Sequence, residues 1–214
     1  MKLLSRFALN RTIAIIIAFD FFVVGAFALL SPIYAVFIVE KIPGGTPAIV
    51  GYALAIYWIV KSVLQIPIAR YLDKNHGEKD DLVALALGVF LGGFVMIGYA
   101  FAHEVWHVYV LQFLFGVADS ILIPPFYAIF TRHIDKGSEG FEWALRSSIS
   151  FGGGSALGGA VGGVMAVQFG FASVFLTIAA ISFLSLGILW FLRNEILPRV
   201  PHTVLRIPLE PHKR

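Results

Sequence analysis

The sequence predicts an all-α integral membrane protein with six transmembrane helices. Of its 214 residues, 58% are hydrophobic and 14% are charged, and the mean hydropathy is +0.85. Soluble domains carry about 25% charged residues, so this composition is typical of a membrane protein. The apolar residues form six runs, each near or above the ~20 residues that a helix needs to cross a bilayer. We therefore expect a multi-pass protein of the cell membrane, which in a prokaryote is the cytoplasmic membrane.

The first apolar run, residues 12–39, follows a short basic arm. It is too long for the core of a signal peptide and has no small-residue cleavage site, so we expect it to be retained. At about 1.5 Å per residue, it exceeds a hydrocarbon core of about 30 Å and must tilt, kink or project. Ser31-Pro32 is the predicted kink, and Pro43-Gly44-Gly45 predicts a tight turn after the run.

The second helix is predicted over residues 47–69, with Thr46 as its cap and Pro47 at its first position. The third and fourth are predicted over 82–102 and 105–130, and the fifth and sixth over 147–168 and 171–192. Polar loops over 70–81 and 131–146 separate the second helix from the third and the fourth from the fifth. Residues 1–194 thus form the predicted transmembrane domain, and residues 195–214 form a predicted cytoplasmic tail.

Lysine and arginine predict the orientation, because cytoplasmic segments retain these residues. Of the sixteen, three lie in the amino-terminal arm, three in each polar loop and five after the sixth predicted helix. Lys41 falls on the opposite side and Lys61 lies within a helix. Both termini are therefore predicted to be cytoplasmic.

Composition also excludes some functions. There is no cysteine, so disulfides, thiolate metal sites and redox nucleophiles are excluded. The formal net charge of +3 is spread over several segments and does not indicate a nucleic-acid partner. No cofactor or metal is expected.

The predicted fifth helix has an unusual number of glycines. In water, each interior glycine costs about 1 kcal/mol relative to alanine, but between membrane helices small residues let two backbones approach closely. This pattern fits packing against a neighbouring helix of the same chain and a seam between subunits equally well. The glycines concerned are Gly154, Gly158, Gly159, Gly162 and Gly163.

Polar side chains within the apolar spans are candidates for a substrate or proton pathway. A charge at the bilayer centre costs about 2.5–3.5 kcal/mol on insertion scales, so such residues usually have a function. Five lie in the first, second and fourth spans, and Tyr34 shares a helical stripe with the first of them. They are Asp20, Lys61, Gln65, Gln112 and Asp119. These three spans are predicted to face a cavity, and the third and sixth to face lipid.

Two of these charges are predicted to pair. Asp20 lies nine residues after Arg11 and Lys61 nine before Arg70, so antiparallel neighbours would hold both at the same depth. Such a pair would either line a polar pathway or only make two buried charges tolerable. Asp119 has no basic partner on its own helix. Because a carboxyl group buried without a counter-charge binds a proton more readily, Asp119 is a candidate for proton coupling.

Three motifs in this order resemble one half of a major facilitator superfamily transporter. After the second span, Ala69 to Lys79 resembles the cytoplasmic signature: Asp73 and Lys74 match, while Ala69 replaces its first glycine and the second is displaced by one. In the fourth span Gly116 and Pro124 match, but Gln112 replaces an arginine. Gly154 to Gly163 resembles the antiporter signature, with Gly159 in place of its proline.

The resemblance implies a transporter that moves a small solute by alternating access, with the site between two six-helix halves. It implies that the first and fourth helices line the cavity and that the second and fifth face the other half. Arg70, Asp73 and Lys74 would form a cytoplasmic gate. The second half would be another copy in a parallel homodimer or a second half-size chain. The glutamine at position 112 puts proton coupling through that position in doubt.

Two alternatives remain. The chain could be a membrane subunit or scaffold without transport activity. His103-Glu104-Val105-Trp106-His107 also matches the HExxH motif of zinc metalloproteases. It falls in the short external connection between the third and fourth spans, with no third ligand in the sequence, so we expect interfacial residues and not an enzyme.

Overall fold

A computed structural model of the chain describes residues 9–75 and 77–196. Every regular element in these residues is helical, and six segments are long and apolar enough to cross a bilayer, with α6, η2 and α7 counted as one segment. The elements are α1 (Arg11–Ala28), α2 (Tyr34–Lys41), α3 (Pro47–Asn75), α4 (Glu78–Ala100), α5 (Val105–His133), α6 (Glu139–Arg146), the π-helix η2 (Ser147–Gly154), α7 (Ser155–Phe169) and α8 (Phe171–Ile196).

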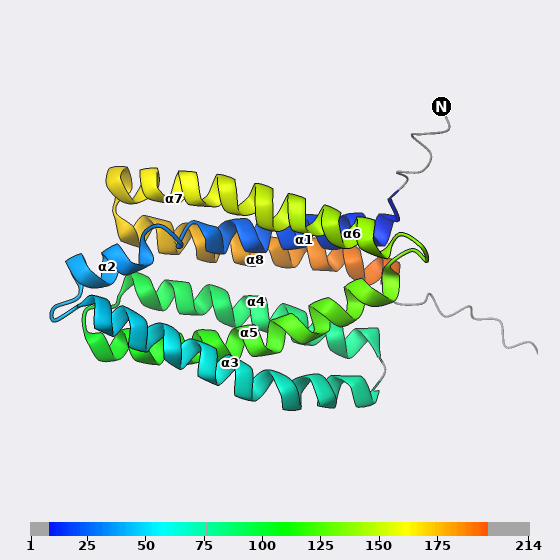
Figure 1. Cartoon of the computed structure of the whole chain (residues 1–214), viewed down its shortest axis with the longest axis horizontal. Coiled ribbons are helices and arrows are strands. Elements are labelled where there is room, and N and C mark those ends of the chain that lie inside the picture. Colours follow the sequence, from blue (N-terminus) through cyan, green and yellow to red (C-terminus); the bar gives the residue numbers. More distant parts are fainter. Residues whose placement is uncertain (1–8, 76, 197–214) are drawn as a thin grey trace, which may run out of the picture.

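The long helices lie roughly parallel and antiparallel to one another in a single bundle (Figure 1). α1 begins and α8 ends at the same end of the bundle, where α3 also turns into α4 and α5 into α6 (Figure 1). α2 and the turns from α4 to α5 and from α7 to α8 lie at the opposite end. The two ends of the described chain are therefore on the same side, as an even number of spans requires.

The first predicted span is not one continuous helix. α1 ends at Ala28 and α2 begins at Tyr34, and the residues between them form successive turns that include Ser31 and Pro32. Proline has no amide hydrogen to donate to the carbonyl of Ala28, and its ring clashes with that carbonyl. The predicted kink is thus a complete break, which leaves α2 as a separate short helix.

The polar loops are shorter than their predicted ranges. α3 continues to Asn75, and α4 begins at Glu78 instead of residue 82, with Glu78, Asp80 and Asp81 in its first turn. Acidic side chains stabilise the first turn of a helix, where the amide groups carry partial positive charge. The loop predicted over 131–146 likewise contains the end of α5 and all of α6. The predicted tail lies outside the described residues from position 197 onward.

Each long helix packs on a small set of neighbours. α3 packs chiefly on α5, α5 on α4, α4 on α8, and α8 on α1, while α1 also contacts η2 and α7. α3 and α7 therefore lie at the two edges of this series, and α3 is the least buried of the six spans. The interior holds two apolar clusters. One lies around Phe37, Tyr99 and Phe175, and the other around Phe19 and Phe126.

Candidate functional site

The charged side chains in the apolar spans form two ion pairs, and neither is the predicted one. Asp20 on α1 binds Arg146 at the end of α6, and Lys61 on α3 binds Asp119 on α5. The predicted pairing of Asp20 with Lys61 is wrong because α3 packs on α5, whereas α1 packs on α8, η2 and α7. Position along a helix gives the depth of a charge but not the helix beside it.

The pair on α3 and α5 is the centre of the candidate site. Lys61 Nζ lies 2.5 Å from Asp119 Oδ2, and the Tyr57 hydroxyl donates to the same oxygen at 2.5 Å. Lys61 Nζ also donates to the Tyr57 hydroxyl oxygen at 3.3 Å. The side chains of Lys61 and Asp119 are 14% and 18% exposed, so the pair is largely buried but remains partly accessible.

Local sequence explains why these groups meet. Tyr57 and Lys61 are one turn apart, so they share a face of α3. Gly116 lies on α5 about one turn before Asp119, and a Cβ there would lie 2.8 Å from the Tyr57 carbonyl oxygen. Only glycine lets the two helices approach this closely. The Tyr57 ring also stacks on Phe115 at 5.3 Å between ring centroids, which fixes its hydroxyl beside Asp119.

A cavity of about 680 Å³ begins one turn from this pair, between α3 and α5. Gln65 follows Lys61 by four residues, Ile123 follows Asp119 by four, and both line the cavity. It lies toward the end of the bundle where α3 and α5 separate from each other (Figure 1). Its volume falls within the about 300–1,000 Å³ typical of small-molecule sites. The Gln65 Oε1 atom is buried without a hydrogen-bond partner among the described residues.

The second pair is enclosed. The Arg146 guanidinium binds Asp20 at 2.9 and 3.3 Å, and both side chains are only 8% exposed. Four aromatic rings surround it, with centroids 4.5–5.7 Å from the guanidinium carbon: Phe126, Tyr127, Trp143 and Phe151. The sequence places Arg146 at the end of a predicted polar loop, so Arg146 was not among the predicted site residues. The signal available was an arginine directly before the glycine-rich span, three residues after a tryptophan.

Gln112 and Tyr34 form a third polar contact, in the bundle interior. The Gln112 side-chain amide donates to the Tyr34 hydroxyl, and both residues are buried. This bond ties α2 to α5 beside Tyr99, whose ring lies edge-on to that of Tyr34. Gln112 lies two turns from Asp119 on α5. The predicted pathway residues are thus brought together in separate groups, not in one site.

The sequence matches the Major Facilitator Superfamily over residues 13–209. The chain belongs to this superfamily. Its members are membrane transporters and not enzymes, and the chain is a multi-pass protein of the cell membrane.

Several curated members of the superfamily are similar to the chain. It is 31% identical over 140 residues to the multidrug resistance protein MdtG of Rahnella sp. (strain Y9602), covering 64% of this chain and 32% of the relative. It is 28% identical over 174 residues to MdtG of Yersinia enterocolitica, covering 79% and 40%. A multi-drug resistance efflux pump PmrA homolog of Lactococcus lactis is 28% identical over 162 residues, covering 75% and 39%. The alignments thus span about a third to two-fifths of the length of these relatives.

The superfamily's glycine signature packs within this chain. A Cβ at Gly158 would lie 2.3 Å from the Gly25 carbonyl oxygen, and one at Gly162 would lie 2.1 Å from that of Leu29. Gly154 also faces Gly25 on α1. The predicted subunit seam is therefore wrong for these three glycines, because α1 covers them. Gly159 and Gly163 have open space beside them, and a seam there remains a prediction.

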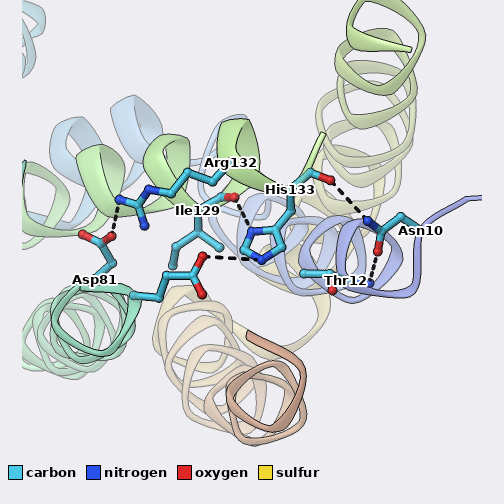
Figure 2. A network of polar contacts seen from close by, with 7 residues as sticks. Asn10, Thr12, Asp81, Ile129, Arg132 and His133 are labelled. Atoms are coloured by element: carbon cyan, nitrogen blue, oxygen red, sulfur yellow. Dashed lines mark hydrogen bonds and ion pairs between the residues drawn. The ribbon is translucent and has the colours of Figure 1, made fainter. Parts of the chain in front are cut away.

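The residues predicted to form the superfamily's cytoplasmic gate have different positions. Arg70 and Asp73 line the cavity, but Lys74 does not. An ion pair that was not predicted joins Arg132 on α5 to the nearly buried Asp81 on α4, with 2.6 Å between the Arg132 nitrogen and the Asp81 oxygen. Figure 2 shows this pair beside a second connection. There, the His133 ring lies 3.4 Å from the Glu78 carboxylate. The backbone carbonyl of His133 accepts a hydrogen bond from the Asn10 side-chain amide at 3.3 Å.

The residues that match the HExxH motif form the start of α5. α5 begins at Val105, so His103 precedes the helix and does not share a helical face with His107. The His107 ring accepts from the Glu104 amide at 3.1 Å, and the Trp106 indole donates to the Glu104 carboxylate at 2.6 Å. The first of these bonds satisfies a backbone amide that a helix start leaves unpaired. Within residues 9–75 and 77–196, no three metal-binding side chains come together.

Proposed function

We propose that the chain is a unit of a secondary active transporter that moves a small solute by alternating access. The observation that carries this proposal is the Lys61–Asp119 pair, which lies one turn from a drug-sized cavity. Opposite charges in an apolar span are costly, and they are usually retained where they line a pathway.

The two ion pairs support different roles. The Asp20–Arg146 pair is enclosed by aromatic rings, so a purely structural role accounts for it. The Lys61–Asp119 pair is less enclosed, and its neighbour Trp58 is 56% exposed. A scaffold has no need for a partly accessible charge pair beside a cavity. This contrast favours transport over the scaffold alternative and selects one pair as the pathway.

We infer that a second six-helix unit completes the pathway, either as a parallel copy of this chain or as a different one. α3 lies at the edge of the bundle and exposes large apolar side chains that a second unit would cover. These exposed side chains include Tyr52, Trp58, Ile59, Val63 and Ile66. At the other edge, Gly159 and Gly163 on α7 leave room for a close helix contact. The superfamily resemblance implies the same two helices.

Proton coupling through Asp119 is part of the proposal. Its carboxylate has a counter-charge, Lys61, which the sequence did not predict, and also accepts from Tyr57. Arg70 and Asp73, which line the same cavity, are the proposed cytoplasmic gate.

Reconstitution into liposomes tests the proposal. The purified chain is expected to move at least one member of a panel of sugars, amino acids and cationic drugs. Lys61→Gln and Asp119→Asn should reduce that transport, whereas Asp80→Asn, which changes an exposed carboxylate at the bundle end, should not. Transport that is equal in all four proteins would contradict the proposed pathway. Lack of transport by the unmodified chain alone and with a partner unit would favour a scaffold.

A further inference from the structure

We propose that the Lys61–Asp119 site binds monovalent organic cations, and that the Lys61 ammonium is a tethered occupant which the incoming cation displaces. This inference rests on the proposed function and names its substrate class. It is drawn from the four groups that surround Lys61 Nζ, namely one carboxylate, one hydroxyl and two aromatic faces.

These groups are those that recognise an organic cation. Lys61 Nζ lies 5.0 Å from the centroid of the Trp58 ring and 5.5 Å from that of Tyr57, within the ~6 Å of a cation–π contact. The Asp119 carboxylate supplies the counter-charge at 2.5 Å. Aromatic faces next to a carboxylate are a common way to bind quaternary ammonium ligands. Lys61 therefore occupies a site that a ligand cation would fit.

The Asp20–Arg146 pair shows why the occupant at Lys61 is exchangeable. Arg146 is also a cation held by a carboxylate and aromatic rings, but it is 8% exposed and bound to both carboxylate oxygens. Its planar, bidentate fork is fixed, whereas lysine is a point charge on a flexible stem. Lys61 contacts one Asp119 oxygen and lies beside the exposed Trp58 ring. The Lys61 side chain can therefore swing away without disrupting the bundle.

The adjoining cavity supplies room for the apolar body of such a cation. It begins one turn from the pair, and Ile66, Ile123 and Pro124 form part of its wall. An anion would instead have to displace Asp119, which the Tyr57 hydroxyl also holds. It would then lie beside aromatic faces, which carry negative electrostatic potential. The site therefore favours a cation over an anion.

Binding of tetraphenylphosphonium to the purified chain in lipid nanodiscs tests this inference. Lys61→Met removes the tethered competitor and leaves the carboxylate and rings, so affinity should rise about tenfold. Asp119→Asn should lower affinity about tenfold relative to the unmodified chain. Lys41→Met is the matched control: Lys41 lies 5.8 Å from the Phe171 ring, without a carboxylate partner among the described residues. Its affinity should not change.

The inference is overturned if Lys61→Met binds the probe no more tightly than the unmodified chain. It is also overturned if Lys61→Met abolishes binding of the anion 8-anilinonaphthalene-1-sulfonate while Asp119→Asn strengthens it, because the site would then bind anions. If Lys61→Met does not fold, Trp58→Leu decides: weaker tetraphenylphosphonium binding supports the inference and unchanged binding overturns it. Liposome transport separates the two proposals, since Asp119-dependent transport of an uncharged solute would retain the function and reject the cation site.

Discussion

Arg146 binds both carboxylate oxygens of Asp20, a residue 126 positions earlier in the chain. This contact fixes the start of the fifth span against α1. The π-helix η2 begins at the next residue, and it is followed by the glycines of α7 that lie against α1. The interface between α1 and the fifth span thus has a charged end and a glycine-lined part, which can be tested separately.

Substitutions of Asp20 and Arg146 should have strongly non-additive effects on the free energy of unfolding. Asp20→Asn or Arg146→Gln alone leaves a buried charge without its partner and should reduce the free energy of unfolding by about 3–5 kcal/mol. The double variant should lose less than the sum of the two single losses, because it leaves neither charge unpaired. Unfolding of the four proteins in detergent measures the coupling. Simply additive losses would show that the two residues do not interact.

Adjacent glycines on α7 should respond differently to the same change. Gly158→Ala and Gly162→Ala place a methyl group against the α1 backbone and should cost about 1–3 kcal/mol of folding stability. Gly159→Ala and Gly163→Ala enter open space, and higher helix propensity should make them neutral or stabilising by up to about 1 kcal/mol. Melting temperatures compare the four variants.

Equal destabilisation by all four changes would contradict the packing of α7 on α1. The same positions also test assembly. If Gly159 and Gly163 form a seam, Gly159→Leu should reduce dimer formation in a mild-detergent mass measurement and leave membrane insertion unchanged. An unmodified chain that is strictly monomeric in that measurement would reject the homodimer.

The hydrogen bond between Gln112 and Tyr34 should be worth more than a typical surface bond. Tyr34→Phe leaves the buried Gln112 amide without its acceptor and should cost about 1–3 kcal/mol. Tyr52→Phe is the control, because Tyr52 is exposed and should not affect stability. Thermal unfolding of the two variants makes the comparison. Equal melting temperatures would mean that the amide finds another partner.

Asp119→Asn should uncouple transport from the proton gradient. At a solute concentration that saturates both proteins, uptake driven by a pH difference should be lost, while exchange of solute across the membrane should continue. Asparagine keeps an acceptor for Tyr57 but cannot take up a proton. Uptake by the variant with unchanged dependence on the pH difference would eliminate Asp119 as the coupling residue.

The sequence was sufficient to predict the membrane spans and to identify most of the polar residues within them. Hydropathy identifies helices, and spacing identifies residues on one face, so Lys61, Asp119 and Gln112 were found as candidates. The sequence was not sufficient to predict which residues these side chains bind. Helix neighbours are determined by close packing at positions such as Gly116. Arg146 was missed for a related reason. It lies in an amphipathic segment, and only the surrounding rings and Asp20 make it a buried charge.

If the cavity beside Lys61 and Asp119 is the transport pathway, transported solute should protect a single cysteine placed in its wall. The chain contains no cysteine, so Gln65→Cys introduces the only thiol, at a position that lines the cavity. Leu87→Cys is the control, because Leu87 on α4 is exposed and lines a different cavity. Saturating transported solute should slow maleimide labelling of Gln65→Cys and leave labelling of Leu87→Cys unchanged. Labelling of Gln65→Cys at the same rate with and without solute would show that this cavity is not the transport pathway.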